Sequence, residues 1–214
     1  MLNKKFYDRD PCLVAVDLLG KVIRHRYKGI WLAARIIETE AYYLTDKGSH
    51  ASLGQTPSRT ALFMPAGTIY MYYARGRDSM NISCHGAGNA VLLKSGFPYF
   101  DKKTDPKALN YMQKAYKEPR PLERLCAGQT LLCQALYLKL PQWNQQEFHK
   151  DELFIDDVKY RPKQIIQTTR LGIPHGRDEH LPYRFVDAEF AKFCTQNPLR
   201  KGHKEGKDYQ LLYI

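Results

Sequence analysis

Two carboxylates near the end of an apolar run are the residues of this sequence best placed to do chemistry. The run Arg35-Ile-Ile-Glu-Thr-Glu-Ala-Tyr42 has the pattern of a half-buried β-strand, which puts Glu38 and Glu40 on one face. A carboxylate held partly inside a fold is suited to accept a proton as a general base. A second strand, Gly67-Thr-Ile-Tyr-Met-Tyr-Tyr73, supplies aromatic rings that can form the walls of a pocket for a planar base.

The chain is strongly basic. Its 33 lysines and arginines outnumber 22 acidic residues, so the 214 residues carry a formal net charge of +11, distributed along the whole sequence. This charge favours a polyanionic partner such as nucleic acid, and a basic surface without such a partner is the alternative. We expect no membrane contact, because no apolar run approaches the roughly 18 residues of a span and the polar start has no signal core.

Cysteine and histidine usage bears on metals and on the compartment. The five cysteines are odd in number and form no Cys-x-x-Cys pair, and the seven histidines are scattered without metal-ligand spacing. We therefore expect no metal, no organic cofactor and no disulfide framework. A reduced compartment is the simplest location, so the expected protein is cytoplasmic, and associated with the nucleoid if the organism is prokaryotic.

The elements that position these residues are expected to form one mixed α+β domain over residues 1–214. Asp10, Pro11 and Gly20 mark the cap, first turn and end of a short helix over residues 12–19, and Gly29 marks the turn of a hairpin. Strands are expected over residues 22–27, 30–41, 68–74, 89–94, 153–160, 165–171 and 183–186. Further helices are expected over residues 105–116, 131–138 and 188–194. A long loop is expected over residues 45–66 and a basic tail over about 198–214.

Short motifs between Glu38 and Phe185 form one ordered set. In order, they are Glu38-Thr-Glu-Ala-Tyr42, His50, Gln55-Thr-Pro57, Leu62-Phe-Met-Pro-Ala-Gly-Thr-Ile-Tyr-Met-Tyr72, Met80-Asn-Ile82, Ala90-Val-Leu-Leu93, Leu125-Cys-Ala-Gly128, Leu132-Cys-Gln-Ala-Leu136, Arg170-Leu-Gly-Ile173 and Tyr183-Arg-Phe185. The set resembles the alkyladenine (3-methyladenine) DNA glycosylase family across nearly the whole chain. The resemblance implies a curved, mainly antiparallel β-sheet surrounded by helices, with a protruding DNA-binding β-hairpin near residues 73–78.

The resemblance implies catalytic roles for two residues. Glu40 matches the general base, which activates the water that attacks the sugar of a flipped nucleotide. The alternative for Glu40 is a strand-end ion pair with an arginine. Lys94 matches an arginine that helps to hold this water, and an ammonium keeps the charge but loses the planar fork. Glu38 is expected to form a structural ion pair with Arg35 or Arg170.

The resemblance also implies a base pocket. Tyr42, His50 and Tyr72 match residues that line it, and a positively charged alkylated purine is attracted to aromatic faces. Asn81 matches the residue that obstructs the exocyclic amine of guanine. The alternative for the aromatic strand is packing in the core, which we expect for Tyr70.

Further positions are expected to contact DNA. Arg75 stands where the family usually has an apolar or aromatic wedge that fills the gap left by the flipped nucleotide, and a plain phosphate contact is the alternative. Gly76 and Arg77 belong to the same hairpin. Thr56 and Arg59 lie in the Gln55-Thr-Pro-Ser-Arg59 loop, where one positive charge is moved by a residue relative to the family pattern.

The resemblance thus implies a monofunctional enzyme of base excision repair that acts as a monomer on double-stranded DNA containing damaged purines. An intact abasic site is the expected product, because the implied catalytic group is a carboxylate and not an amine that forms a Schiff base. One alternative is a lesion-binding protein of the same fold that has lost turnover through Arg75 and Lys94. Glu40 argues against it, because a pure binder has no use for a desolvated carboxylate facing a polyanion. Charge and aromatic strands alone also permit an RNA-binding module.

Overall fold

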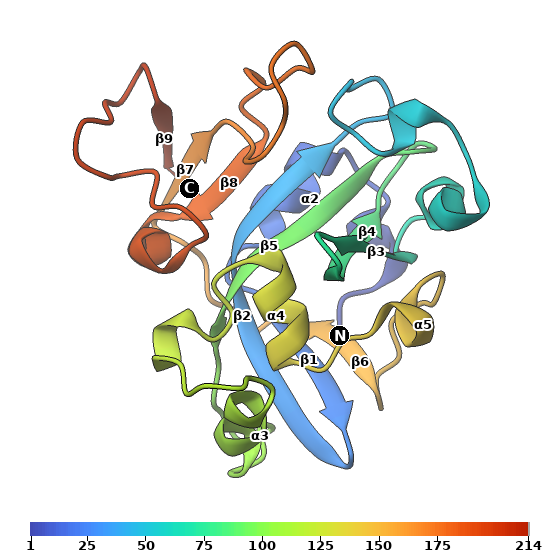
Figure 1. The fold of residues 1–214 in the computed structure, drawn as a ribbon, viewed down its shortest axis with the longest axis vertical. Coiled ribbons are helices and arrows are strands. Elements are labelled where there is room, and N and C mark those ends of the chain that lie inside the picture. Colours follow the sequence, from blue (N-terminus) through green and yellow to red (C-terminus); the bar gives the residue numbers. More distant parts are fainter. Residues whose placement is uncertain (214) are drawn as a thin grey trace.

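A curved antiparallel sheet forms the centre of the fold (Figure 1), and the structure, a computed structural model, describes residues 1–213. Its strands are β1 (Val22–Tyr27), β2 (Ile30–Tyr42), β3 (Ile69–Ala74), β4 (Arg77–Ser83), β5 (Ala90–Pro98), β6 (Leu153–Asp156), β7 (Gln164–Thr168), β8 (Arg184–Asp187) and β9 (Tyr209–Tyr213). Their order is β3-β4-β5-β2-β8-β7-β9, and β1 pairs with β2 and β6. The long strand β2 therefore joins all parts of the sheet.

Short helices pack on both sides of the sheet. These are α1 (Lys4–Tyr7), α2 (Pro11–Leu18), α3 (Ala108–Lys114), α4 (Gln129–Ala135) and α5 (Leu140–Trp143), with 3₁₀ turns at Ala51–Leu53, Pro57–Phe63, Leu122–Arg124 and Ala188–Phe193. Figure 1 shows α4 in front of β5 and α2 behind it. The start of α2 is fixed by the Asp10 carboxylate, which accepts from the N–H groups of Cys12 and Leu13. Within residues 1–213, none of the helices has the length and apolar character needed to cross a membrane.

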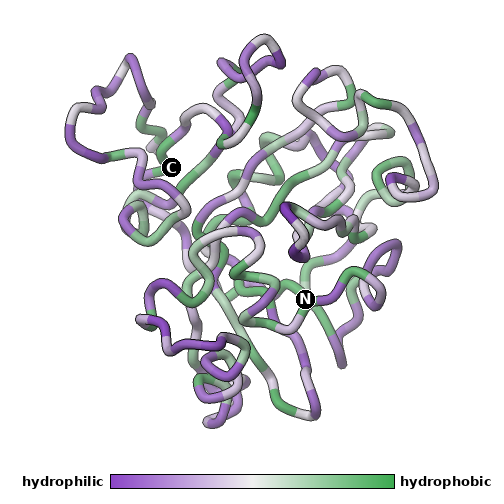
Figure 2. The backbone as a smooth tube through the Cα atoms, in the orientation of Figure 1, coloured by the Kyte–Doolittle hydropathy of each residue, from purple (hydrophilic) through white to green (hydrophobic). Residues whose placement is uncertain are grey.

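The two faces of β2 serve different purposes. Thr39 faces α2 and donates its hydroxyl to the Ala15 carbonyl at 2.9 Å, whereas Glu38 and Glu40 lie on the opposite face, as the alternation predicts. The pairing of β2 with β5 is irregular between Ile36 and Thr39. Figure 2 shows apolar residues gathered in the central strands and hydrophilic residues in the outer loops. The two carboxylates are therefore buried polar groups within an apolar centre.

The expected fold class is confirmed, and so are the helix after Asp10, the hairpin of β1 and β2, and the hairpin near residues 73–78. Two strands were not predicted. The pattern gave no strand over Arg77–Ser83, because β4 buries polar Ser79 and Ser83 where an apolar alternation is normally sought. The other is β9: within the basic tail over about 198–214, of which Ile214 lies outside the described residues, the Tyr209–Tyr213 segment pairs with β7.

Candidate active site

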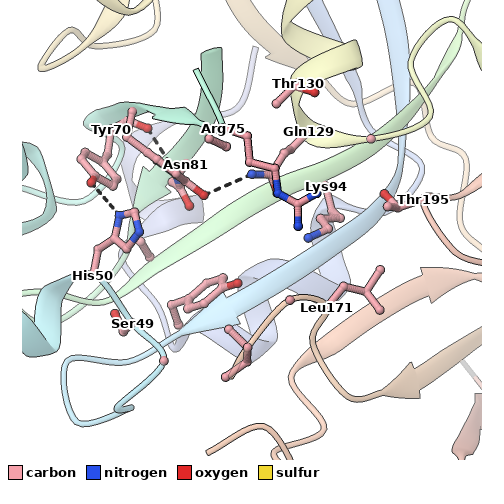
Figure 3. A pocket seen from close by; sticks show the side chains of 18 of the residues that line it. Ser49, His50, Tyr70, Arg75, Asn81, Lys94, Gln129, Thr130, Leu171 and Thr195 are labelled. Carbon is pink, nitrogen blue, oxygen red and sulfur yellow. Dashed lines mark hydrogen bonds between the residues drawn. The ribbon is translucent and has the colours of Figure 1, made fainter. Parts of the chain in front are cut away.

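A cavity of about 730 Å³ opens between the β3–β4 hairpin, the loop before α4, and the loops around residues 48–53 and 171–177 (Figure 3). Cavities of this size accommodate small organic groups. Predicted site residues Tyr42, His50, Tyr72, Arg75, Arg77, Asn81 and Lys94 line it, together with Ser49, Leu53, Tyr70, Gly128, Gln129, Leu171, Arg177 and Thr195. The fold thus brings together residues from distant parts of the chain that the sequence had singled out separately.

Glu40 lies directly behind the cavity wall and is fully buried. Its Oε2 accepts from the Tyr42 hydroxyl at 2.7 Å, and its Oε1 accepts from the Leu171 N–H at 3.0 Å. The Lys94 ammonium bridges both oxygens, at 3.2 Å from Oε1 and 3.3 Å from Oε2. Because Tyr42, Lys94 and Leu171 all line the cavity, only their atoms separate this carboxylate from it.

The surroundings of Glu40 keep it ionised. Burial alone raises the pKa of this carboxyl, but the charge of Lys94, then the bonds from the Leu171 N–H and the Tyr42 hydroxyl, outweigh burial and hold the pKa below its ordinary value. Burial and the neighbouring carboxylate raise the pKa of Tyr42 well above its ordinary value. Tyr42 therefore remains a phenol that donates to a charged acceptor at neutral pH.

Glu38 has a structural partner, but not one of those expected. Its Oε1 accepts from Nε of Arg184 at 2.7 Å, because Arg184 lies on β8, which pairs directly with this part of β2. The expected pair with Arg35 or Arg170 is wrong. Arg170 instead binds Asp46 at 2.8 Å, and the Arg35 guanidinium lies over an aromatic ring. Each of these cations therefore has another partner.

The Glu38 carboxylate also fixes a segment near the C-terminus. Its Oε2 accepts from the N–H and hydroxyl of Thr195, each at 3.1 Å, and from the hydroxyl of Ser95. Arg184 adds a bond of 2.6 Å to the carbonyl of Gln196. Figure 3 shows Thr195 beside Lys94 at the cavity wall. The buried Glu38–Arg184 pair thus attaches this part of the wall to the sheet.

Aromatic rings form another wall of the cavity. The ring of His50 meets the ring of Tyr72 edge-on at 4.4 Å between centroids, and its Nδ1 lies 3.0 Å from the Tyr70 hydroxyl. Tyr70 is buried, as expected for a packing residue. Desolvation, then the charges of Arg59 and Arg177, lower the pKa of His50, so its imidazole is neutral at pH 7.

Polar side chains complete that wall. The Asn81 amide donates to the Tyr70 carbonyl at 3.4 Å, and the Tyr72 hydroxyl accepts from the Gln129 amide at 3.1 Å. Both bonds are drawn in Figure 3. The hydrogen bonds between the wall residues fix the orientation of the Tyr72 ring, so this side of the cavity is preformed.

The predicted cationic residues occupy two places. Arg75 and Arg77 lie exposed at the cavity, and Arg75 and Gly76 form the tight turn of the hairpin with φ angles of 51° and 76°. Thr56, Arg59 and Gly76 do not line the cavity. Arg59 donates to backbone carbonyls of the adjacent loop, and the Thr56 hydroxyl lies 3.1 Å from that of Ser58.

Several residues that line the cavity were not predicted as site residues, among them Gln129, Leu171, Arg177 and Thr195. Leu171 acts through its backbone N–H, which has no signature in a sequence, although it lies in one of the recognised motifs. Gln129 directly follows Gly128, the last residue of a recognised motif, at the start of α4. This position next to a motif is the one feature of the sequence that could have indicated Gln129 as a site residue. Thr195 and Arg177 lie in segments without a recognised motif.

Among residues 1–213, no group of three or more His, Cys, Asp or Glu side chains is arranged to hold a metal ion. An ionised carboxylate behind a cavity wall can accept a proton from a group bound in the cavity, and aromatic rings on the opposite wall can hold a planar group.

Comparisons with known proteins cover nearly the whole chain. Residues 5–190 match the family model described as "Methylpurine-DNA glycosylase (MPG)". A protein of Pseudomonas aeruginosa described as "Putative 3-methyladenine DNA glycosylase" is 64% identical over 99% of this chain and 90% of its own length. A protein of the same description from Pseudomonas savastanoi is 61% identical over 99% of this chain and 96% of its own length. Another, from Clostridium acetobutylicum, is 34% identical over 83% of this chain and 88% of its own length.

Proposed function

This chain belongs to the methylpurine-DNA glycosylase family, and from that premise we propose that it removes damaged purines from duplex DNA with a water activated by Glu40. Membership supports a DNA glycosylase, a hydrolase of N-glycosyl bonds that binds DNA. The observation that supports the finer proposal is the buried, ionised carboxylate of Glu40, held against the cavity by Tyr42, Lys94 and the Leu171 N–H. A carboxylate in that position is suited to catalysis.

The reaction requires the target nucleotide to leave the base stack, because the C1′ atom is inaccessible within a duplex. With the purine in the cavity, the water oxygen bonds to C1′ and a water proton passes to Glu40. The bond from C1′ to the base nitrogen breaks, and its electron pair leaves with the purine. An alkylated purine that carries a positive charge leaves as a neutral molecule, so the carboxylate also opposes charge that develops on the sugar.

Lys94 controls access of water to Glu40 in this proposal. Each carboxylate oxygen accepts about two hydrogen bonds, and Lys94 fills one position on each oxygen beside the fixed donors Tyr42 and Leu171. The Lys94 side chain is the flexible member of this set. A small shift of its ammonium towards the cavity frees a lone pair of Glu40 and lets Lys94 hold the attacking water.

Base recognition falls to the aromatic wall. Tyr42, His50 and Tyr72 present rings to a planar base, and their faces attract an electron-deficient purine more strongly than a normal one. Asn81 lines the cavity, and in this proposal its side chain obstructs the exocyclic amine of guanine. Arg75, Gly76 and Arg77 of the hairpin contact the DNA backbone, and Thr56 and Arg59 support the neighbouring loop that does the same.

The test is release of 3-methyladenine and hypoxanthine from duplex DNA, measured together with binding of the same lesion duplexes. We expect free base and an intact abasic site, with no adduct trapped by borohydride because Glu40 forms no Schiff base. Lesion binding without release would support instead the lesion-binding alternative. A trapped adduct would contradict the monofunctional mechanism.

A further inference from the structure

A large apolar side chain stands exposed at the mouth of the cavity. Leu53 lines the cavity, yet 56% of its surface is accessible. Among residues 1–213 several large hydrophobic side chains are exposed, but Leu53 is the one of them that lines the cavity. An exposed leucine at this point would contact anything that approaches the opening, and its exposure in the free protein is unfavourable.

The loop that carries Leu53 is firmly built. Ala51 is fully buried beside Leu62 and Tyr70, and anchors the 3₁₀ turn Ala51–Leu53. Arg59 donates from Nη1 to the carbonyls of Leu53 at 3.2 Å and Gly54 at 3.1 Å. The Gly54 N–H bonds to the Ala51 carbonyl at 2.9 Å, with Gly54 at a φ of 82°. Leu53 therefore lies on a loop that is held in place by buried Ala51 and by hydrogen bonds to its backbone.

The residue at the tip of the hairpin has different chemistry. Arg75 is also exposed and lines the cavity, but its guanidinium is permanently charged. The space left by a flipped nucleotide is bounded by the apolar faces of two bases, whereas the duplex exterior carries phosphates. An apolar side chain matches the first surface, and a guanidinium matches the second.

We propose that Leu53 enters the base stack and fills the gap when the nucleotide is flipped, while Arg75 contacts a phosphate. This inference rests on the proposed function, because a wedge is needed only if a nucleotide leaves the duplex. Leucine is one of the side chains that proteins insert between base steps. Leu53 thus holds the flipped state open from the loop, and the hairpin clamps the backbone.

The experiment compares one lesion in two contexts. Hypoxanthine is placed in a duplex and in the same strand alone, where no gap has to be filled, and kcat/KM is measured for each. We expect Leu53→Ala to lower kcat/KM about tenfold on the duplex and less than about twofold on the single strand. Leu53→Met, which restores an apolar side chain, should recover most of the duplex activity.

Two further variants control the experiment. Leu13 is 58% exposed on α2 and does not line the cavity, so Leu13→Ala matches the substitution and should leave both substrates unaffected. Arg75→Ala should weaken duplex binding without selectively slowing release from bound duplex, because it removes a phosphate contact. Thermal unfolding of each variant verifies that an exposed side chain has been removed without loss of the fold.

The possible outcomes are distinguishable. Equal losses on duplex and single strand would assign Leu53 to the base pocket and overturn the wedge, and so would full duplex activity in Leu53→Ala. A selective loss of release from bound duplex in Arg75→Ala alone would place the wedge on the hairpin. If the wild-type protein releases neither hypoxanthine nor 3-methyladenine, whether from duplex or from single-stranded DNA, the proposed function itself fails, and the wedge with it.

Discussion

At the scale of single residues, the charge of Glu40 depends on donors that all face the cavity. Its pKa is lower in the folded protein than the ordinary value of a glutamate side chain. The ionised form therefore stabilises the fold above the unfolded-state pKa, and this contribution is lost as the pH falls through the folded-state pKa. The same depression keeps the proposed general base ready at neutral pH, and Lys94 is the largest of the favourable influences.

Replacing Lys94 should therefore move the pH dependence of base release. Lys94→Gln removes the largest influence that lowers the pKa of Glu40, so this pKa rises and we expect the acidic limb of the kcat/KM profile to move upwards. Lys94→Arg retains the charge and serves as the control. A pH profile of single-turnover base release measures the shift, and an acidic limb that stays in place in Lys94→Gln would contradict this account.

At the scale of elements, the junction of β2 with β8 supports the site. Glu38 and Arg184 pair across this junction and hold the segment around Thr195 against the cavity. Both side chains are almost completely buried. Removing one partner leaves an uncompensated charge in the interior, which is far more costly than losing a pair at the surface.

The stability of variants should reflect this difference. We expect Arg184→Met to lower the free energy of unfolding by about 3–5 kcal/mol, because it strands the Glu38 carboxylate. Glu147→Gln breaks the surface pair with Lys4, at 2.7 Å, and should cost less than about 1 kcal/mol. Urea unfolding of the two variants beside the wild type measures both values. Similar small losses in both would show that the buried pair does not hold the junction.

Local pattern predicted the elements that carry their own signals. Asp10 and Pro11 marked the start of α2, and Gly29 marked the turn between β1 and β2. Strand β4 was not predicted because its buried serines, Ser79 and Ser83, interrupt the apolar alternation. The Ser83 hydroxyl is accommodated by a tertiary contact, its bond to the Ala61 carbonyl, which local pattern does not reveal. The site residues came from ordered motifs. Their unpredicted partners act through a backbone N–H or across long separations in the chain.

At the scale of the whole molecule, the net charge of +11 is the main determinant of approach to DNA. Each phosphate neutralised by a lysine or arginine releases condensed counterions, so affinity for duplex DNA should fall steeply as salt rises. Within this field, Arg75 and Arg77 lie exposed at the cavity, where the proposed function requires the DNA to deliver a flipped base. General attraction and specific placement are therefore carried by the same type of side chain.

Salt titrations should separate these contributions. We expect the logarithm of the binding constant to fall linearly with the logarithm of salt concentration, and Arg77→Ala to reduce the slope by about one contact. Arg161→Ala is a suitable control, because Arg161 pairs with Asp157 and does not line the cavity. Fluorescence anisotropy with a labelled lesion duplex measures the slopes. A salt-independent affinity would argue against DNA as the partner.

The most direct measurement of the central claim is base release by Glu40→Gln on a lesion duplex, made beside a binding measurement on the same DNA. The amide keeps the shape of the side chain but cannot accept the proton of the attacking water. We predict that release falls by at least about 100-fold while lesion affinity stays within about tenfold of the wild type. Release at the wild-type rate would show that Glu40 is not the general base.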